Sequence, residues 1–456
     1  MRGKFITITL AAMLSVLLTG CFSWSAEESY KLPQPPQAYQ NLTNAVNQTK
    51  RALAAEYSTT VEDVPPSSGD NTSTVQLLDM DADGAQETAV SFLRVVGAEN
   101  PIRIYFYTLK DENGYVVSSV VEGAGDGVYS VHYADVDGRT DAEGRLCKEV
   151  VVSWQMGNEA YYLGVYTLDD SDEQMLVSTT YEGYRLLDLD EDGRMELAVA
   201  RFDPDQKLGE VVMYDWQNER EPVQQRIALS AGLSAVRQVR AGVLADQVPA
   251  LYVSSDLADG RRVTDVLAVN KRGELANLSL DHESGISREV CDPYRDLAPT
   301  DVNGDGVPEV ARPRQLNSYG TSVGAWLIDW VQYTREGRVK AVCTTYHNTA
   351  DGWYLVVPQH WQSRLILSRH DNVSGQRAVN FSLWQGEGKD PLTFLTVYKL
   401  TGSSRSLRAN TGNRFVLAEE NNAVYAAAFH SGWNCGVDQN GLLESFRLIV
   451  SSWSSD

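Results

Sequence analysis

Short runs of aromatic and β-branched residues recur along most of the chain, and each is followed by a polar turn and a further run of the same kind. Clear examples are IRIYFYTL, YYLGVYTL, EVVMYDW and AWLIDWVQY. These residue types are enriched in strands because they pack well on a pleated, half-buried surface. The pattern therefore predicts an all-β protein from about residue 75 to the end of the chain.

Three short acidic segments interrupt this pattern, and each leads directly into a strand-like run. They share the form D-x-[DN]-x-D-G-x-x-E and read DMDADGAQE, DLDEDGRME and DVNGDGVPE. Side-chain oxygens at positions 1, 3, 5 and 9, with a backbone carbonyl at position 7, form the ligand set of a hard cation such as Ca²⁺. The glycine at position 6 permits the sharp turn. Without a cation the clustered carboxylates would repel one another.

The sequence therefore predicts three calcium sites. The predicted side-chain ligands are Asp79, Asp81, Asp83 and Glu87; Asp188, Asp190, Asp192 and Glu196; and Asp301, Asn303, Asp305 and Glu309. The predicted carbonyl ligands belong to Ala85, Arg194 and Val307.

A fourth, distorted copy begins at Asp135 and reads DVDGRTDAEG. Its spacing breaks after Asp137-Gly138, because extra residues precede Glu149, which matches the final glutamate of the intact loops. We expect Asp135 and Asp137 to bind metal weakly or not at all. Asp141 or Glu143 could compensate by turning toward the site.

The copies recur at a period of about 55 residues. The step from Asp79 to Asp135 is 56 residues, the next step to Asp188 is 53, and the step to Asp301 is 113, or about two periods. A silent copy is therefore predicted near residue 243, where GVLADQVPAL has lost its acidic positions. Extension of the period predicts two more strand-like copies, near residues 357 and 412.

Fifty-five residues suit four short strands, which make one blade of a β-propeller. One blade cannot bury both of its faces, so neighbouring blades stack to form the core. Seven units over residues 75–456 predict a seven-bladed β-propeller, with six or eight blades as alternatives. Before it, Leu42, Val46, Leu53 and Tyr57 lie at helical spacing and predict a short amphipathic helix, within residues 41–74, that packs on the propeller.

The loop-plus-strand unit resembles the FG-GAP/VCBS repeat of integrin-type β-propellers. The resemblance is carried by the three intact loops and their following strands; the FG and GAP dipeptides themselves are absent. It implies calcium bound within the blades and propeller faces that bind other molecules.

The first 20 residues are read as a bacterial lipoprotein signal peptide. A basic start, MRGK, precedes an apolar stretch that is too short to span a membrane comfortably, and Leu18-Thr19-Gly20-Cys21 matches a lipobox. Lipidation of Cys21 would anchor the protein at the extracytoplasmic face of the cell membrane, and residues 21–40 read as a proline-rich tether. An ordinary secretory signal is the alternative, and the type of envelope stays open.

The charge of the chain narrows the class of partner. The formal net charge is −22, and it becomes −24 once Arg2 and Lys4 leave with the signal peptide. This excess of negative charge argues against nucleic acid as a partner. The remaining cysteines allow three disulfide pairings, which the sequence leaves open, and they form no zinc motif. They are Cys147, Cys291, Cys343 and Cys435.

Sequence motifs for catalysis are weak. Residues 320–324 match G-x-S-x-G around Ser322, but a turn precedes them and a strand-like run follows, where a hydrolase needs a strand and then a helix. The histidines are scattered, and among the aromatic residues Trp433 is the best candidate for exposure. The sequence therefore favours a monomeric binding module for a protein or a glycan over the alternative, a hydrolase or lyase that acts on polysaccharide or ester from a propeller face.

Overall fold

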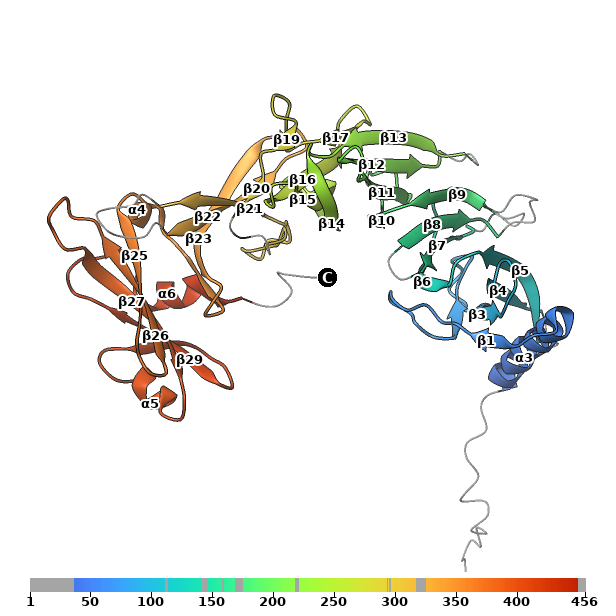
Figure 1. The fold of residues 1–456 in the computed structure, drawn as a ribbon, viewed down its shortest axis with the longest axis horizontal. Coiled ribbons are helices and arrows are strands. Elements are labelled where there is room, and N and C mark those ends of the chain that lie inside the picture. The colour runs from blue at the N-terminus through green and yellow to red at the C-terminus, as the bar shows by residue number, and fades with distance from the viewer. Residues whose placement is uncertain are drawn as a thin grey trace, which may run out of the picture. The chain divides into compact units, whose positions relative to one another are not determined.

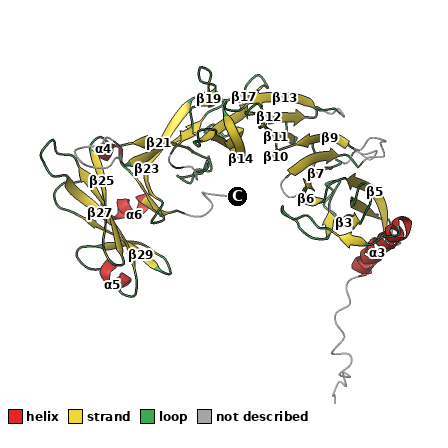
Figure 2. Cartoon of the chain, viewed as in Figure 1, coloured by secondary structure: helices red, strands yellow, loops and turns green. Residues whose placement is uncertain are grey.

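The computed structural model describes residues 37–110, 114–140, 144, 146–157, 160–168, 175–217, 221–292, 294, 297–316 and 325–449. The signal peptide, Cys21, most of the tether, Asp141, Glu143 and Ser322 lie outside these residues. The structure is mostly β, with 52% strand and 9% helix (Figures 1 and 2). It divides into two compact units: unit 1 comprises residues 1–79 and 84–127, and unit 2 comprises residues 80–83 and 128–456.

Unit 1 combines one helix with one antiparallel sheet. Its first sheet contains β1 (Val61–Asp63), β2 (Val75–Leu78), β3 (Thr88–Val95), β4 (Ile102–Leu109) and β5 (Tyr115–Gly123). Helix α3 (Gln37–Tyr57) buries Leu42, Val46 and Leu53 against apolar residues of β3 and β4. The helix begins at Gln37, so the last residues assigned to the tether are helical.

Unit 2 contains five more antiparallel sheets, which follow one another along the chain. The second sheet has β6 (Gly127–Ala134), β7 (Glu149–Met156), β8 (Ala160–Tyr166) and β9 (Met175–Thr180); the third has β10 (Gly183–Leu187), β11 (Glu196–Asp203), β12 (Leu208–Asp215) and β13 (Val223–Ala228). The fourth has β14 (Leu233–Val243), β15 (Pro249–Leu257), β16 (Arg262–Val269), β17 (Leu275–Asn277) and β20 (Val290–Cys291), beside a small ribbon of β18 (Leu280–Asp281) and β19 (Ile286–Ser287). The fifth has β21 (Val310–Gln315), β22 (Trp326–Tyr333), β23 (Val339–Asn348), β24 (Trp353–Val356) and β30 (Phe446–Leu448). The sixth has β25 (Leu365–Val373), β26 (Gln376–Leu383), β27 (Leu392–Thr401), β28 (Phe415–Glu419) and β29 (Ala423–Phe429), with the short helices α4 (Gln359–Gln362), α5 (Arg405–Ala409) and α6 (Gln439–Ser445) around it.

Neighbouring sheets of unit 2 stack because their inner strands are apolar on both faces. In β11, Leu197 and Val199 pack with the second sheet, while Ala198 and Ala200 pack with the fourth sheet. Successive side chains of a strand point to opposite faces, so a continuous apolar run supplies both contacts. This explains why strands such as β11 read as unbroken hydrophobic runs.

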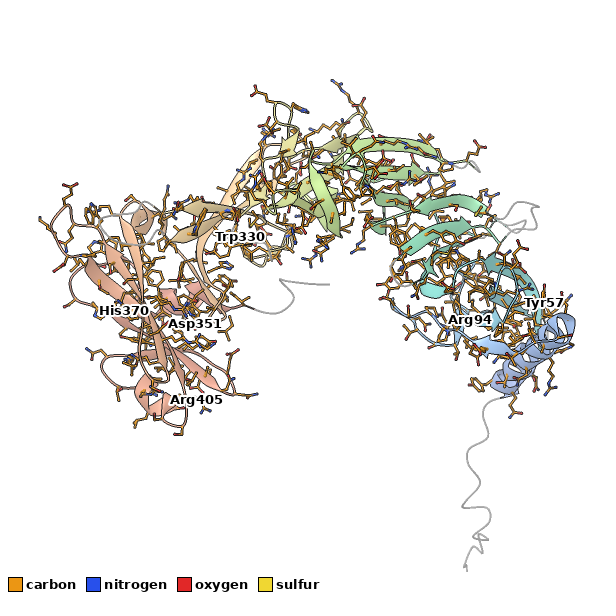
Figure 3. All side chains as sticks on the ribbon, in the orientation of Figure 1. Tyr57, Arg94, Trp330, Asp351, His370 and Arg405 are labelled. Carbon is orange, nitrogen blue, oxygen red and sulfur yellow. The ribbon has the colours of Figure 1, made fainter. Side chains whose placement is uncertain are left out.

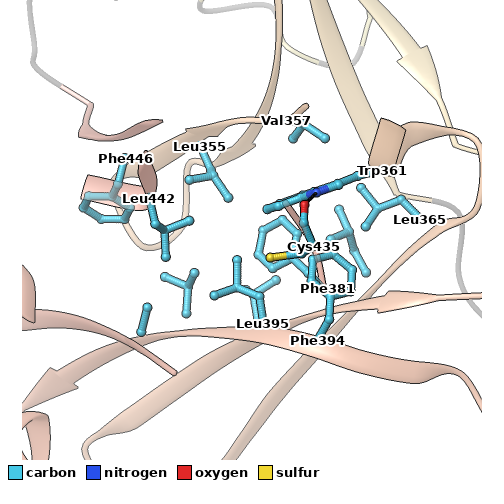
Figure 4. Packing of buried hydrophobic residues seen from close by; sticks show 14 of the residues in the cluster. Leu355, Val357, Trp361, Leu365, Phe381, Phe394, Leu395, Cys435, Leu442 and Phe446 are labelled. Carbon is cyan, nitrogen blue, oxygen red and sulfur yellow. Dashed lines mark hydrogen bonds between the residues drawn. The ribbon is translucent and has the colours of Figure 1, made fainter. Parts of the chain in front are cut away.

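The largest core lies between the fifth and sixth sheets (Figure 4). Trp361 packs edge-on against Phe394, with ring centroids 4.8 Å apart, and its indole N–H donates to the carbonyl of Cys435 at 2.8 Å. Trp330 and Trp353 are also buried, and Trp433 is half-buried against Phe394. The tryptophans described here therefore serve mainly as core residues, and Trp433 is less exposed than the sequence suggested.

The end of the chain departs from the predicted repeat. The sequence predicts separate units that begin near residues 357 and 412, but β29 pairs with β27, and β28 pairs with β29, in the same sheet as β25 and β26. Part of the first segment, Gln359–Gln362, is helical where a strand was expected. The described residues thus form six sheets of four or five strands, where the period predicted seven units. Cys147, Cys291, Cys343 and Cys435 are all free thiols.

No helix of the described residues is both long enough and apolar enough to cross a membrane.

His347 should make the fold sensitive to acid. Its ring, on β23, is buried and stacks on Tyr354 with centroids 5.0 Å apart, and burial lowers the pKa of His347 to about 3. An unfolded histidine has a pKa of about 6.5, so stability is full above that pH and falls as the pH drops from about 6.5 toward 3, by about 1.4 kcal/mol per unit. We expect His347→Phe, which keeps an aromatic ring, to lose this dependence.

The measurement is urea unfolding of both proteins at pH 7 and pH 5 in chelator. The native protein should lose about 2 kcal/mol more than His347→Phe between these values. Equal losses in the two proteins would show that His347 is not the acid-sensitive group.

Candidate functional site

The acidic loops occupy the same place in successive sheets. The Asp79 loop joins β2 to β3, the Asp135 loop joins β6 to β7, and the Asp188 loop joins β10 to β11. The Asp301 loop precedes β21, where Thr300 and Glu309 form a β-bridge. The predicted silent copy is the short turn between β14 and β15, in which Leu244 N–H donates to the carbonyl of Val248 at 2.8 Å. The spacing of the loop copies along the sequence therefore corresponds to the spacing of successive sheets along the chain.

The structure brings the predicted acidic ligands together in every loop. In each group one ligand oxygen per residue lies within 4.8 Å of the others. The groups are Asp79, Asp81, Asp83 and Glu87; Asp188, Asp190, Asp192 and Glu196; Asp301, Asp305 and Glu309; and Asp135, Asp137 and Glu149. Among the described residues, no group of this kind contains histidine or cysteine. An all-oxygen set fits a hard divalent cation better than zinc or copper.

The Asp188 loop shows how the chain draws the carboxylates inward. Asp188 Oδ2 accepts the N–H of Gly193 at 3.0 Å, and Asp190 Oδ1 accepts the N–H of Asp192 at 3.1 Å. Gly193 has a φ of +94°, which an L side chain rarely adopts. Asp188 Oδ1 is buried and has no hydrogen-bond partner among the described residues. Because an unsatisfied buried carboxylate oxygen is costly, a cation at this point would satisfy it.

A buried glutamate closes each of three loops. Glu196, Glu309 and Glu149 each accept, through Oε2, the N–H of the second residue of their own loop, at 2.5, 2.7 and 3.0 Å. Each of them is almost fully buried. Burial first, and neighbouring carboxylates second, raise the pKa of Glu196 and of Glu309 to about 7, and the pKa of Glu149 to about 8. The folded loops therefore hold these carboxylates where their negative charge is poorly solvated. A bound cation would compensate for this loss of solvation.

The Asp301 loop differs because a glutamine from β22 enters it. Gln332 donates through Nε2 to Asp305 Oδ2 at 2.9 Å and to Glu309 Oε1 at 2.6 Å. The hydrogen bond from Gln332, together with one from Asn303, lowers the pKa of Asp305. Gln332 thus holds two predicted ligands in one orientation without supplying charge.

The Asp135 loop supplies its own cation. Asp137 is fully buried, and the guanidinium of Arg139 donates to its Oδ2 at 2.5 Å while the Arg139 backbone N–H donates to Oδ1 at 2.9 Å. Glu149 still reaches the position that ends the other loops, so the inserted residues do not displace it. Arg194 pairs with Asp192 in the Asp188 loop in the same way, but the side chain of Asp192 is 31% exposed, whereas that of Asp137 is fully buried. Arg139 therefore neutralises buried charge that solvent cannot reach, and weak or absent metal binding in the Asp135 loop stays a prediction.

Sequence reasoning missed three partners of the loops. Arg139 and Arg194 each pair with an aspartate two residues earlier, Asp137 and Asp192, and this short spacing is a signal that could have been used. Gln332 lies on a later strand, so the loop sequence gives no sign of it. The orientation of the predicted carbonyl ligands at Ala85, Arg194 and Val307 stays a prediction.

A chain of aromatic rings forms a second candidate site, which the sequence analysis also missed. Tyr129, Tyr161, Tyr181 and Tyr184 follow one another with ring centroids 4.8, 6.3 and 5.1 Å apart, and His132 lies edge-on to Tyr184 at 5.8 Å. Tyr129 is 37% exposed, and the other rings are partly exposed. The rings come from β6, β8, β10 and the connection between β9 and β10.

Two hydroxyl pairs fix the tyrosine chain. The hydroxyls of Tyr184 and Ser130 share a hydrogen bond of 3.0 Å, and the hydroxyls of Tyr181 and Ser153 share another. Rings held in this way lose little conformational entropy when a ligand binds to them. The repeated tyrosines in YSVHY, YY and YEGY were the signal in the sequence.

Calcium should stabilise the protein through the three intact loops. Saturation about a hundredfold above the dissociation constant adds about 2.7 kcal/mol of unfolding free energy for each site. We therefore expect excess calcium to raise the melting temperature above its value in chelator. Glu196→Gln keeps the size of the side chain and removes its charge. The calcium-dependent rise in melting temperature should therefore fall by about the contribution of one site.

Glu149→Gln is the matched control, because Glu149 has the same position and burial in the loop that contains Arg139. This variant should keep the full calcium-dependent rise. A melting temperature that does not respond to calcium, or an equal reduction in both variants, would contradict the assignment of the sites.

Comparison of the chain with protein-family models and with curated proteins gave no match. The resemblance to FG-GAP/VCBS repeats stays a prediction that rests on the loop residues quoted above.

Proposed function

We propose that this chain is a lipid-anchored, extracytoplasmic binding protein in which calcium-stabilised sheets present an aromatic surface to a glycan. The observation that carries the proposal is the tyrosine chain on the second and third sheets. Ligands of this class are recognised by aromatic faces, on which the C–H groups of a sugar ring stack, together with nearby hydroxyls. Tyr129 offers an exposed ring, and the serine-bound hydroxyls of Tyr181 and Tyr184 hold the adjoining rings in place.

The proposed architecture is a β-propeller in which the sheets are blades. Supporting features are the sheets of four or five strands that follow one another along the chain, the apolar contacts between successive sheets of unit 2, and the loop that recurs at one position. The proposed ion is calcium, because a flexible set of carboxylates and carbonyls suits it better than magnesium, which keeps most of its water.

A binding role accounts for the buried acids better than catalysis does. Asp265 accepts hydrogen bonds from Ser230 and Asn277, and Glu289 is paired with Arg312. Groups that are already bonded inside the fold have a structural role without any substrate. Ser322, on which the alternative of a hydrolase depends, lies outside the described residues.

Membrane attachment through Cys21 is a separate part of the proposal. Cys21→Ser should abolish lipid labelling and move the protein from the membrane fraction to the soluble fraction, because two acyl chains anchor a protein stably. The measurement is fractionation of cells that make each form. A variant that stays with the membrane without lipid would place the anchor elsewhere.

Glycan binding should depend on the tyrosine chain. We expect the protein to bind members of a panel of cell-wall and host glycans, and Tyr129→Ala and Tyr161→Ala to weaken that binding about tenfold or more, since loss of an aromatic contact costs roughly 1–3 kcal/mol. Tyr39→Ala, at a tyrosine of α3 that is 59% exposed, is the matched control and should bind normally.

The same panel is tested for turnover of glycoside, ester and peptide substrates. Binding to secreted proteins without any glycan binding would contradict the glycan partner. Turnover would contradict the binding-only function, and its loss in Ser322→Ala would support the hydrolase.

A further inference from the structure

One end of the sixth sheet carries basic residues that no carboxylate neutralises. Residues 401–418, which contain α5, include three arginines and no acidic residue, although the whole chain has a net charge of −22. The three are Arg405, Arg408 and Arg414. We call residues 401–414, together with the β25–β26 turn at residues 373–376, the α5 surface. Figure 3 labels Arg405 at the end of the sheet where Figure 1 places α5.

The arginines of the α5 surface bind backbone carbonyls. Arg408 donates to the carbonyl of Ser374 at 3.2 Å, to that of Gly375 at 2.9 Å, and to that of Thr401. Arg405 donates to the carbonyl of Asn421 at 3.1 Å. Carbonyls hold the guanidinium groups in place without cancelling their charge. The α5 surface is therefore a fixed cluster of positive charge.

Arg414 completes the cluster from the other side of α5. It donates to the carbonyl of Arg408 and to Gln376 Oε1, each at 3.1 Å, and its guanidinium lies over the ring of Tyr398 at 3.9 Å. These contacts join α5 to the β25–β26 turn. Both segments consequently belong to one surface.

The nearest acidic residues are either paired or lie at the edge of this surface. Asp371 pairs with Arg369 at 2.8 Å, and Glu420 accepts a hydrogen bond from the hydroxyl of Tyr425 at 3.0 Å. Glu419 ends β28, beside Glu420. Residues 369–377 and 399–420, together with Asp351, which pairs with Arg369 and Arg377, contain six basic and four acidic side chains, so the balance at this end of the sheet is positive.

Large apolar side chains project from the same surface. Leu407, within α5, is 71% exposed, which is the highest value for a large hydrophobic residue of the described chain. Val373, at the start of the β25–β26 turn, is 54% exposed. Arg408, next to Leu407, binds the carbonyl of Ser374, next to Val373, so the two segments that carry these apolar side chains are in contact.

We propose that the α5 surface docks on an anionic lipid bilayer. Leu407 and Val373 enter the interface between headgroups and acyl chains, while the arginines meet the lipid phosphates. Basic side chains near an anionic membrane and apolar side chains within its interface contribute together to such binding. The contact is independent of the proposed glycan site, which lies on other sheets. It would give the protein a second attachment to the membrane, besides the proposed lipid anchor at Cys21.

The net negative charge of the protein does not prevent this contact. At physiological ionic strength the screening length is about 8 Å, so charges on distant sheets act weakly on the α5 surface. The apolar residues distinguish the lipid from other anions, because a soluble polyanion gains nothing from Leu407. The proposal therefore makes binding depend on Leu407 as well as on salt.

The test is sedimentation with lipid vesicles of a chain that lacks residues 1–21, which keeps every residue that the structure describes. Vesicles of phosphatidylcholine alone are compared with vesicles that also contain phosphatidylglycerol, at equal free calcium. We expect binding to the anionic vesicles, and a loss of about tenfold in Leu407→Ser, because the leucine no longer leaves water. Leu208→Ser is the matched control: Leu208, on β12, is 53% exposed and should be dispensable.

Melting curves of both serine variants show whether each is folded, and exposure of both leucines predicts that they are. Binding to neither kind of vesicle would overturn the proposal, as would equal effects of the two variants. Binding that falls in Arg405→Gln but not in Leu407→Ser, and that soluble polyphosphate competes away, would overturn it in favour of a polyanion.

Discussion

Three of the acidic loops depend on a glutamate that links the loop to the strand that follows it. The backbone of Glu196 begins β11, while its carboxylate accepts the N–H of Leu189 from inside the loop. The same hydrogen bond recurs at Glu309 and Glu149. It fixes the loop on the sheet, but it also buries a carboxylate among others, where desolvation and repulsion oppose its charge. Each of these three loops must therefore supply compensation for the buried charge.

The copies differ in how they compensate for this charge. A divalent cation suits the intact loops, and Arg139 serves in the Asp135 loop. The silent copy has lost the glutamate, and its Asp246 instead accepts the backbone N–H of Arg335 at 3.1 Å, while the side chain of Arg335 pairs with Glu191 in the Asp188 loop. Even without metal ligands, this turn thus remains tied to its neighbours. One position in the repeat accordingly holds an acidic cluster that could bind metal, an internal ion pair or a contact between sheets.

Features that depend on neighbouring residues could be predicted from the sequence, and those that depend on distant ones could not. The acidic clusters follow from short spacing, the silent copy near residue 243 follows from the period of about 55 residues, and the strands follow from alternating or continuous apolar runs. Gln332 reaches Asp305 from a later strand, and the tyrosine chain joins residues of separate strands, so neither has a local pattern. The last units were miscounted because β28 and β29 look like a new repeat in sequence but complete the sheet of β25–β27.

The most direct test of this account is the number of calcium ions bound per chain, measured by equilibrium dialysis and elemental analysis of the purified protein. The account predicts three bound ions, and two in Asp188→Asn, since the loop that contains Arg139 and the silent copy need no metal. Fewer ions in the native protein, with none lost in Asp188→Asn, would contradict it. Four equal sites would also contradict it, because they would show that Arg139 does not replace the cation.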